Sequence, residues 1–258
     1  KPACLYGAWS YANAHVLPRI LLARRLRDGA DAFRGRAPVR RPGNGRRSDE
    51  VAPPSRRRAR GPDRVSAAGF RSALVGEHPD FAADALDATA WARLERLALA
   101  SPLYAQTLRR FPHHCLWLEE PRNLHTTYRF RALADEWRAF AAPDAAELAD
   151  DNVLLSRLRR WRHLMSLRIA HRGVNELADE ATCVTELTRL AEFCLRECHL
   201  IALRRWTERQ GEPWDEELGR LARFCVLALG KLGGEELNFS SDIDLLYLYE
   251  GEGHCRRD

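Results

Sequence analysis

Two aspartates one residue apart, Asp242 and Asp244, open an apolar run that ends at Tyr249. In a strand, residues i and i+2 point to the same face, and their α-carbons lie about 6.5 to 7 Å apart. Two such carboxylates can share Mg²⁺, which takes one or two protein carboxylates and leaves its other positions to water and phosphate oxygens. Paired metal ions clamp the attacking and leaving oxygens of an in-line transfer. The pair therefore indicates phosphoryl or nucleotidyl transfer.

Between two apolar runs, 224–229 and 243–249, lie residues that suit phosphate binding: three glycines, a lysine and two serines (Gly230, Gly233, Gly234, Lys231, Ser240, Ser241). Glycines let the backbone approach a phosphate closely, and serine hydroxyls can donate hydrogen bonds to it. Lys231 fits a solvated turn equally well. The composition of both runs predicts buried strands. An isolated Asp-x-Asp pair is more often a capped turn, but unpaired carboxylates are costly to bury in an apolar strand, which favours metal ligands.

Residues 230–245 read Gly-Lys-Leu-Gly-Gly-Glu-Glu-Leu-Asn-Phe-Ser-Ser-Asp-Ile-Asp-Leu. They resemble the signature of the bifunctional glutamine synthetase adenylyltransferase/adenylyl-removing enzymes, a family of DNA polymerase beta-like nucleotidyltransferases with two such domains. The Gly-Gly and Asn-Phe-Ser-Ser-Asp-Ile-Asp form resembles the first, adenylyl-removing copy. The second copy usually has Gly-Ser and Thr-Ser-Asp-Leu-Asp, which this chain lacks. The resemblance is strong over 224–249 and weaker over 67–258, where the Arg-rich run 159–172 resembles the helix before the catalytic domain.

The resemblance implies removal of AMP from an adenylylated tyrosine of glutamine synthetase by phosphorolysis, which yields ADP, in a parent protein that also adds AMP. Mg²⁺ is the implied cofactor, ATP, ADP and phosphate are the implied substrates, and the cytoplasm is the implied location. Glutamine synthetase is the implied partner, with a PII signalling protein as a further candidate. Asp242 and Asp244 would be the catalytic metal ligands. The implied phosphate-binding residues are Gly233, Gly234, Ser240, Ser241 and Lys231.

Nucleotidyltransferases of this type need a third carboxylate on a later strand, and the chain stops at Asp258 before such a strand. The polypeptide is therefore expected to be a fragment that is inactive, or nearly so, by itself. Two alternatives remain open. One is a nucleotidyltransferase that modifies a different protein or a nucleic acid. The other is a non-catalytic module whose helices, within 66–209, dock on glutamine synthetase or a PII protein.

The chain has 258 residues, 45% of them hydrophobic, and a formal net charge of +5. Residues 1–64 hold 16 basic against 5 acidic side chains and are rich in Arg, Pro and Gly, which predicts disorder. Nucleic-acid binding by this segment is disfavoured, because it has no aromatic residue after Phe33 to stack on bases. No apolar run is long enough to predict a membrane span. Seven cysteines without a recognisable signal peptide predict free thiols in a reducing compartment. Cys194, Cys198 and His199 match no usual zinc spacing, so they are predicted to be buried side chains on a helix.

From Ser66 onward the apolar residues recur with helical spacing, which predicts helices at 102–108, 126–141, 153–172 and 182–209. The predicted fold class is α+β, with a helical region at 65–213 followed at 214–258 by the beginning of a polymerase-beta-like mixed sheet. The helix at 153–172 is rich in arginine, interpreted as a solvated face with some members available to a phosphate or an acidic partner (Arg157, Arg159, Arg160, Arg162, Arg168, Arg172).

Overall fold

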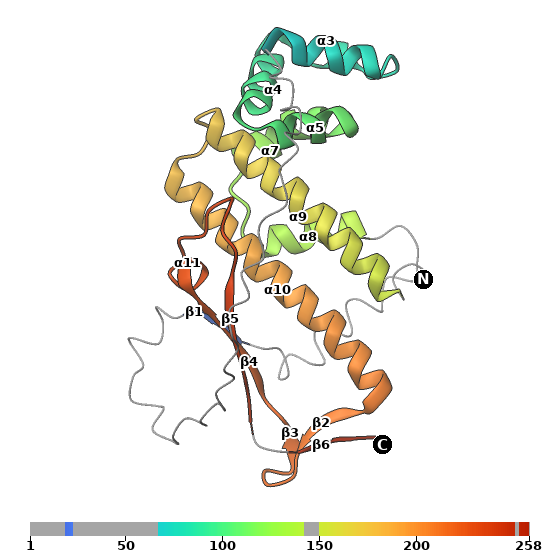
Figure 1. The fold of residues 1–258 in the computed structure, drawn as a ribbon, viewed down its shortest axis with the longest axis vertical. Helices are drawn as coiled ribbons and strands as arrows, with labels where there is room; N and C mark the ends of the chain where they lie inside the picture. Colours follow the sequence, from blue (N-terminus) through green and yellow to red (C-terminus); the bar gives the residue numbers. More distant parts are fainter. Residues whose placement is uncertain (1–18, 23–66, 142–149, 251–252, 258) are drawn as a thin grey trace, which may run out of the picture.

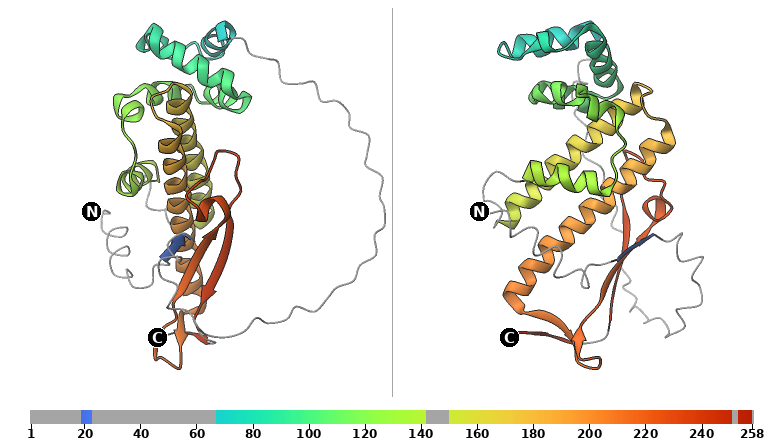
Figure 2. Two further views of the ribbon diagram at one scale, coloured as in Figure 1. Left: turned by 90° about the vertical axis from the view of Figure 1, so that its left-hand side faces the viewer. Right: turned by 180° about the vertical axis from the view of Figure 1, so that it is seen from behind.

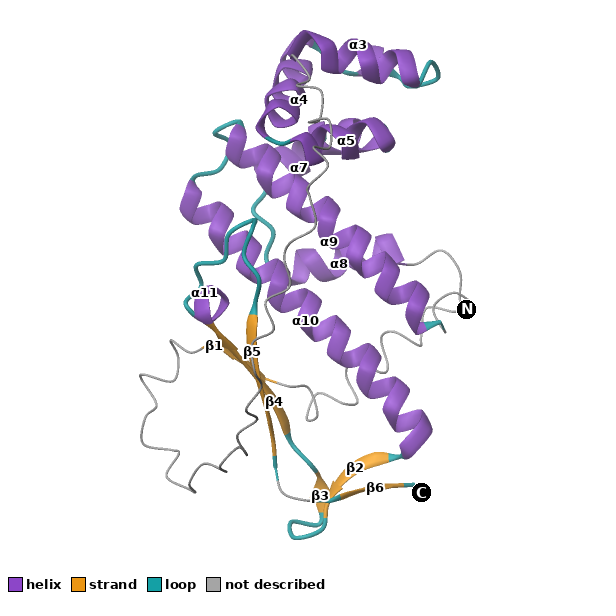
Figure 3. Cartoon of the chain, in the orientation of Figure 1, coloured by secondary structure: helices purple, strands orange, loops and turns teal. Residues whose placement is uncertain are grey.

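A computed structural model describes residues 19–22, 67–141, 150–250 and 253–257 of the chain (Figure 1). Within these ranges every helix except the single turn α11 (Gly230–Gly233) ends by residue 210, and every strand except β1 (Arg19–Leu22) begins after it. Figure 3 shows the division: the strands gather beside and beyond the longest helix, at the end opposite the short N-terminal helices. The predicted α+β class is confirmed.

The described helices lie in two groups joined by two long helices. In chain order the helical elements are α3 (Ala67–Glu77), η2 (Ala83–Ala85), α4 (Ala88–Ala100), α5 (Pro102–Arg110), α6 (His113–Glu119), α7 (Pro121–His125), α8 (Phe130–Ala141), α9 (Asp151–Val174), α10 (Glu180–Gln210) and α11 (Gly230–Gly233). Helices α9 and α10 pack along each other as a helical hairpin (Figure 2). Within the described residues, no helix combines the length and apolar character that crossing a membrane requires.

Aspartate caps fix the starts of the two long helices. The Asp150 carboxylate accepts hydrogen bonds from the backbone N–H groups of Asn152 (2.8 Å) and Val153 (3.4 Å). Asp179 accepts one from the N–H of Thr182 (2.8 Å). These N–H groups have no partner inside the helix, so a capping side chain stabilises the first turn. The helix predicted at 153–172 is therefore α9, which Asp150 caps.

Replacing Asp150 with alanine is expected to lower the free energy of unfolding by about 1 kcal/mol, because two N–H groups lose their acceptor. Urea unfolding followed by far-ultraviolet circular dichroism measures the change. Asn152→Ala is the matched control, since the Asn152 side chain is exposed and makes no hydrogen bond within the described ranges. Equal stability of the two variants would contradict a capping role for Asp150.

Two hydrophobic cores hold the helices together. The first joins α3 to α6 with one face of α9 and includes Trp91 and Leu94, which are 2% and 0% exposed. The second joins α8, α9 and α10 around Trp137, Trp161 and Phe193, whose rings lie 5.6 Å (Trp137 to Trp161) and 5.2 Å (Trp161 to Phe193) apart. Rings at such separations add to the stability that area burial provides. Helix α9 belongs to both cores and therefore ties the two groups together.

Two arginines that were expected on a solvated face are buried instead. Arg168 and Arg172 on α9 are 1% and 2% exposed, and both form ion pairs with Glu186 of α10, which is 3% exposed. The ring of Tyr128 lies 3.7 Å from the guanidinium carbon of Arg168. We call these four residues the Glu186 cluster. The expectation was wrong for Arg168 and Arg172 because their partner is on another helix, whereas Arg159 is exposed as expected.

The strands form two small sheets. They are β1 (Arg19–Leu22), β2 (Glu212–Asp215), β3 (Arg220–Leu221), β4 (Phe224–Leu229), β5 (Asp244–Tyr249) and β6 (His254–Arg256). The first sheet has the order β1-β4-β5 and is mixed, since β1 is parallel and β5 antiparallel to β4. The second has the antiparallel order β3-β2-β6. Strand β1 lies in the segment 1–64 for which disorder was predicted, and the rest of that segment is outside the described residues.

Strand β5 is more exposed than its apolar sequence predicts. Val226 and Ala228 of the neighbouring strand β4 are 4% and 0% exposed, but Leu246 and Tyr247 of β5 are 44% and 57% exposed. The prediction of a buried strand was therefore wrong for β5. The α10 side chains Ala191 and Leu195 pack in the same cluster as Ala228 of β4 and Leu245 of β5, so they cover only part of β5.

Candidate metal- and nucleotide-binding site

The candidate site lies where β4 ends and β5 begins. In the antiparallel register of these strands, Leu229 is paired with Asp244. The chain leaves β4 at Leu229, makes the single helical turn α11, and returns through a loop to Asp244 (Figure 1). Residues fifteen positions apart in the sequence are thereby brought side by side. The glycine segment and the aspartate pair thus meet at one end of the sheet.

Gly230 lies directly against the carboxylate of Asp244. Its φ angle is +56°, in the left-handed region where a side chain is disfavoured. A β-carbon added to Gly230 would lie 2.8 Å from the Oδ2 atom of Asp244, which is closer than two such atoms can approach. The backbone conformation therefore favours glycine here, and any other residue would also displace the carboxylate of Asp244. The predicted glycine turn is this helical turn.

A small hydrophobic cluster connects the loop between β4 and β5 to α10. Ala228 (0% exposed), Leu232 (0%) and Leu237 (6%) pack together against the α10 residues Ala191 and Leu195. This contact holds the α11 segment on the long helix at three points, because Ala228 precedes the turn, Leu232 lies inside it and Leu237 follows it. The loop that carries the candidate site is consequently anchored to the helical region.

Backbone hydrogen bonds shape the turn between these anchors. The N–H of Gly234 donates to the carbonyl of Gly230 (3.0 Å), and the N–H of Glu236 donates to the carbonyl of Lys231 (2.7 Å). Gly233 is buried, Gly234 is half-buried and the Lys231 side chain is exposed. The Lys231 ammonium is exposed to solvent, so it is available to an anionic ligand. Gly234 adds no side chain to the turn.

Asn238 is a residue that the sequence analysis did not single out. Its Oδ1 atom accepts hydrogen bonds from the Ser240 N–H (3.2 Å), the Ser240 hydroxyl (3.3 Å) and the Ser241 hydroxyl (2.6 Å). A sequence signal was present, because an asparagine two residues before a serine favours a turn in which the side chain caps its own backbone. The serine pair is therefore held by a neighbour within the same loop.

Both aspartates of the pair are exposed. Strand β5 begins at Asp244, so Asp242 precedes the strand, and the spacing expected for two residues of one strand does not apply to it. Within the described ranges neither carboxylate makes a hydrogen bond or ion pair, and no group of three metal-ligating side chains is found. Two unpaired oxygen ligands beside an uncrowded backbone fit the preference of Mg²⁺ for few protein ligands and several waters. The donor set therefore suits Mg²⁺.

The cysteines of α10 do not form an alternative metal site in the described part of the chain. Burial raises the pKa of the Cys194 thiol to about 12, so this thiol stays protonated at neutral pH. Metal ligation requires the thiolate. Cys194 and Cys198, one turn later, are both free cysteines.

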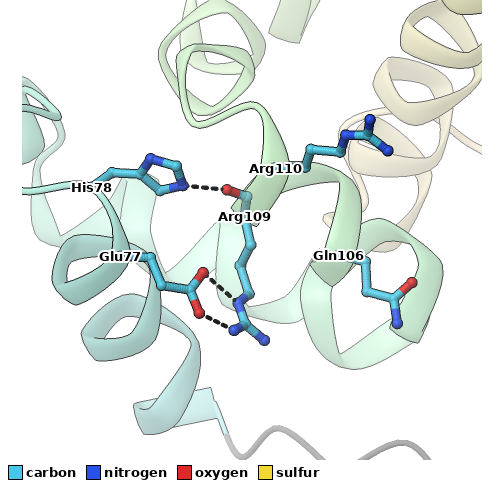
Figure 4. A pocket seen from close by; sticks show the side chains of 5 residues that line it. All are labelled: Glu77, His78, Gln106, Arg109 and Arg110. Carbon is cyan, nitrogen blue, oxygen red and sulfur yellow. Dashed lines mark hydrogen bonds and ion pairs between the residues drawn. The ribbon is translucent and has the colours of Figure 1, made fainter.

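A second feature of the surface is an open hollow between α3 and α5 (Figure 4). The hollow is lined by Glu77, His78, Gln106, Arg109 and Arg110. The Arg109 guanidinium is paired with the Glu77 carboxylate, and the Arg109 carbonyl oxygen lies 2.5 Å from His78 Nε2. The ion pair lowers the pKa of Glu77, mainly through the hydrogen bond from Arg109. The hollow contains none of the predicted site residues, and two of its charged groups, Glu77 and Arg109, are already paired with each other.

Comparison with known proteins assigns the chain to a family. The family model for glutamate-ammonia ligase adenylyltransferase matches residues 91–258. A bifunctional glutamine synthetase adenylyltransferase/adenylyl-removing enzyme of Chromobacterium violaceum is 35% identical over 160 residues, which are 62% of this chain and 16% of that protein. The enzyme of the same name from Methylococcus capsulatus is 30% identical over 239 residues, covering 85% of this chain and 24% of the relative. The chain spans a quarter or less of these relatives, and it belongs to the glutamate-ammonia ligase adenylyltransferase family.

Proposed function

We propose that this chain supplies part of the active site of a Mg²⁺-dependent nucleotidyltransferase that acts on a tyrosine of glutamine synthetase. The proposal rests on one observation above the others: Gly230 adopts a left-handed conformation directly against the Asp244 carboxylate. A backbone that leaves room for a carboxylate at the end of a strand suits a site where that carboxylate binds an ion next to a phosphate. The family and the names of the relatives support the reaction class.

Asp242 and Asp244 would hold Mg²⁺, and the other loop residues would bind the phosphates. When bound, Mg²⁺ neutralises phosphate charge and stabilises the negative charge that develops on the leaving oxygen. Serine hydroxyls and the Lys231 ammonium can donate to phosphate oxygens. The half-buried Gly234 leaves its backbone accessible to them, as the absence of a side chain allows close approach, whereas Gly233 is buried and would act through the shape of the turn. ATP, ADP and phosphate are the proposed substrates.

Within this class we assign the chain to the adenylyl-removing half, on the Gly-Gly and Asn-Phe-Ser-Ser-Asp-Ile-Asp form of residues 233–244. In that reaction an oxygen of inorganic phosphate attacks the phosphorus of the AMP group. The bond from phosphorus to the tyrosine oxygen breaks, ADP forms, and the tyrosine oxygen takes up the proton that the attacking phosphate gives up. Glutamine synthetase is the proposed protein substrate, a PII protein a proposed regulatory partner, and the cytoplasm the proposed location.

The test is the double variant Asp242→Asn with Asp244→Asn. We expect it to abolish Mg²⁺-dependent ATP binding, measured by isothermal titration calorimetry, because amide groups replace both anionic ligands. Asp80→Asn with Asp84→Asn is the matched control, since these aspartates are also exposed and carry the same charge change. ATP binding that persists in the Asp242 and Asp244 variant would contradict the proposal.

The same variants separate catalysis from docking. A non-catalytic helical module would bind adenylylated glutamine synthetase equally well with and without the two aspartates, whereas Mg²⁺ and nucleotide binding at the candidate site would be lost with them. The exposed arginines Arg159, Arg160 and Arg162 of α9 favour such docking on an acidic surface, because they make no ion pair within the described residues. Surface plasmon resonance with immobilised adenylylated glutamine synthetase measures the affinity of this docking.

A further inference from the structure

Asn238 is the centre of the hydrogen bonds that hold the serine pair. Its side-chain oxygen accepts from the backbone and hydroxyl of Ser240 and from the hydroxyl of Ser241. The Ser241 N–H donates to the Asn238 carbonyl oxygen (3.3 Å). Within the described residues, every hydrogen bond of the two serines therefore runs to Asn238. The side-chain atom that faces the serines is fixed as oxygen, since a backbone N–H can only donate.

The backbone of Asn238 is itself anchored. The preceding residue, Leu237, is 6% exposed and packs in the hydrophobic cluster that lies on α10. The side chain of Asn238 is exposed on the other side, as is Phe239 (46%). Asn238 consequently joins a fixed hydrophobic anchor to a polar, solvent-facing loop. A change at its side chain alters the loop without removing the anchor.

One amide oxygen accepts three hydrogen bonds here, which exceeds its two lone pairs. The bond from Ser241 is short at 2.6 Å, and those from Ser240 are long at 3.2 and 3.3 Å. The Ser240 hydroxyl is therefore weakly held. A hydroxyl has one proton to donate, so a serine that donates to Asn238 must exchange this acceptor for a phosphate oxygen when it binds a phosphate.

We propose that Asn238 is a positioning residue of the site: its neutral amide oxygen orients the hydroxyls of Ser240 and Ser241 until a phosphate oxygen of the nucleotide replaces it. This inference rests on the proposed function, because the phosphate belongs to the nucleotide. The neutral charge of the amide is essential. An aspartate at position 238 would keep the acceptor but add a third negative charge to the loop that leads to Asp242 and Asp244. Such a charge repels a phosphate and attracts a cation.

The test uses the 258-residue chain and two substitutions, Asn238→Ala and Asn238→Asp. The readouts are the Kd of MgATP by calorimetry, the Kd of Mn²⁺ alone by electron paramagnetic resonance, and the melting temperature. Asn238→Ala is expected to raise the Kd of MgATP about tenfold and to leave that of Mn²⁺ unchanged. Asn238→Asp is expected to raise the Kd of MgATP about tenfold and to lower that of Mn²⁺ about threefold. A purely structural role would not shift the two ligands in opposite directions.

Asn152→Asp is the matched control, because it adds the same charge at an exposed asparagine in the first turn of α9. The assignment of Asn238 is overturned if either Asn238 variant binds MgATP as wild type does, if Asn152→Asp weakens MgATP equally, or if both Asn238 variants lose about 5 °C or more in melting temperature. Wild-type chain that binds no MgATP, or binding that survives loss of Asp242 and Asp244, overturns the proposed function together with this inference. Binding that requires the aspartates but not Asn238 overturns only the role of Asn238.

Discussion

Replacing Glu186 with glutamine is expected to lower the free energy of unfolding by about 3 to 5 kcal/mol, because it leaves buried guanidinium groups without a counter-charge. Glu186 accepts hydrogen bonds from the Tyr128 backbone N–H (2.8 Å) and from Arg168 Nη1 (3.0 Å), and its other oxygen accepts from Arg172. Burial already lowers the pKa of Arg168, as expected where the charged form is poorly solvated. Without the carboxylate, two cations would share a dry site.

The loss would be large against a typical domain stability of about 5 to 15 kcal/mol. Guanidinium unfolding followed by circular dichroism measures it. Glu136→Gln is the matched control, because Glu136 pairs with Arg122 at the surface, where the arginine side chain is 57% exposed. Such a pair contributes about 0 to 1 kcal/mol. Equal losses from the two substitutions would show that the buried arginines reach solvent when Glu186 is neutral.

Replacing Gly230 with alanine is expected to weaken Mn²⁺ binding at least about tenfold, since the new methyl group would displace the Asp244 carboxylate. The same substitution should destabilise the fold by about 1 to 2 kcal/mol, because a side chain is disfavoured at a φ of +56°. The displaced atom is the end of a flexible side chain, so the steric contact costs little stability and acts mainly on the metal ligand. Mn²⁺ binding should therefore weaken by more than the loss in the free energy of unfolding accounts for.

Gly219 provides a control that separates the two effects. Its φ angle is +61°, close to that of Gly230, but a β-carbon there would meet no atom within 4 Å. Gly219→Ala should lose a similar amount of stability in urea unfolding and bind Mn²⁺ as wild type does. If both variants lost Mn²⁺ binding equally, the contact between Gly230 and Asp244 would have no role in metal binding.

The helices could be predicted from the sequence because their signals are local. A cap such as Asp150 and an apolar stripe such as Trp91 and Leu94 depend on residues within a few positions of one another. The partner of a buried arginine is not local. Glu186 lies 14 residues from Arg172 and 18 from Arg168, on another helix, so helical spacing alone placed both arginines in solvent.

The candidate site was predictable in composition but not in geometry. The residue types around Asp244 indicated phosphate chemistry, and the assignment of each site residue stays a prediction. The role of Gly230 depends on the register of β4 with β5, which pairs Leu229 with Asp244 and which no single segment encodes. The exposure of β5 was missed for a related reason, since an apolar sequence does not tell which elements cover each face of a strand.

Helix α10 serves two parts of the molecule at once. Its first half carries Glu186 and Phe193 into the helical cores, and Ala191 and Leu195, in the same stretch, carry the loop of the candidate site. A domain boundary between residues 213 and 214 would therefore separate this loop from the α10 residues on which it packs. Shortened forms of the chain for biochemical work should begin before α10 rather than after it, because the loop of the candidate site packs on a helix that precedes it in the sequence.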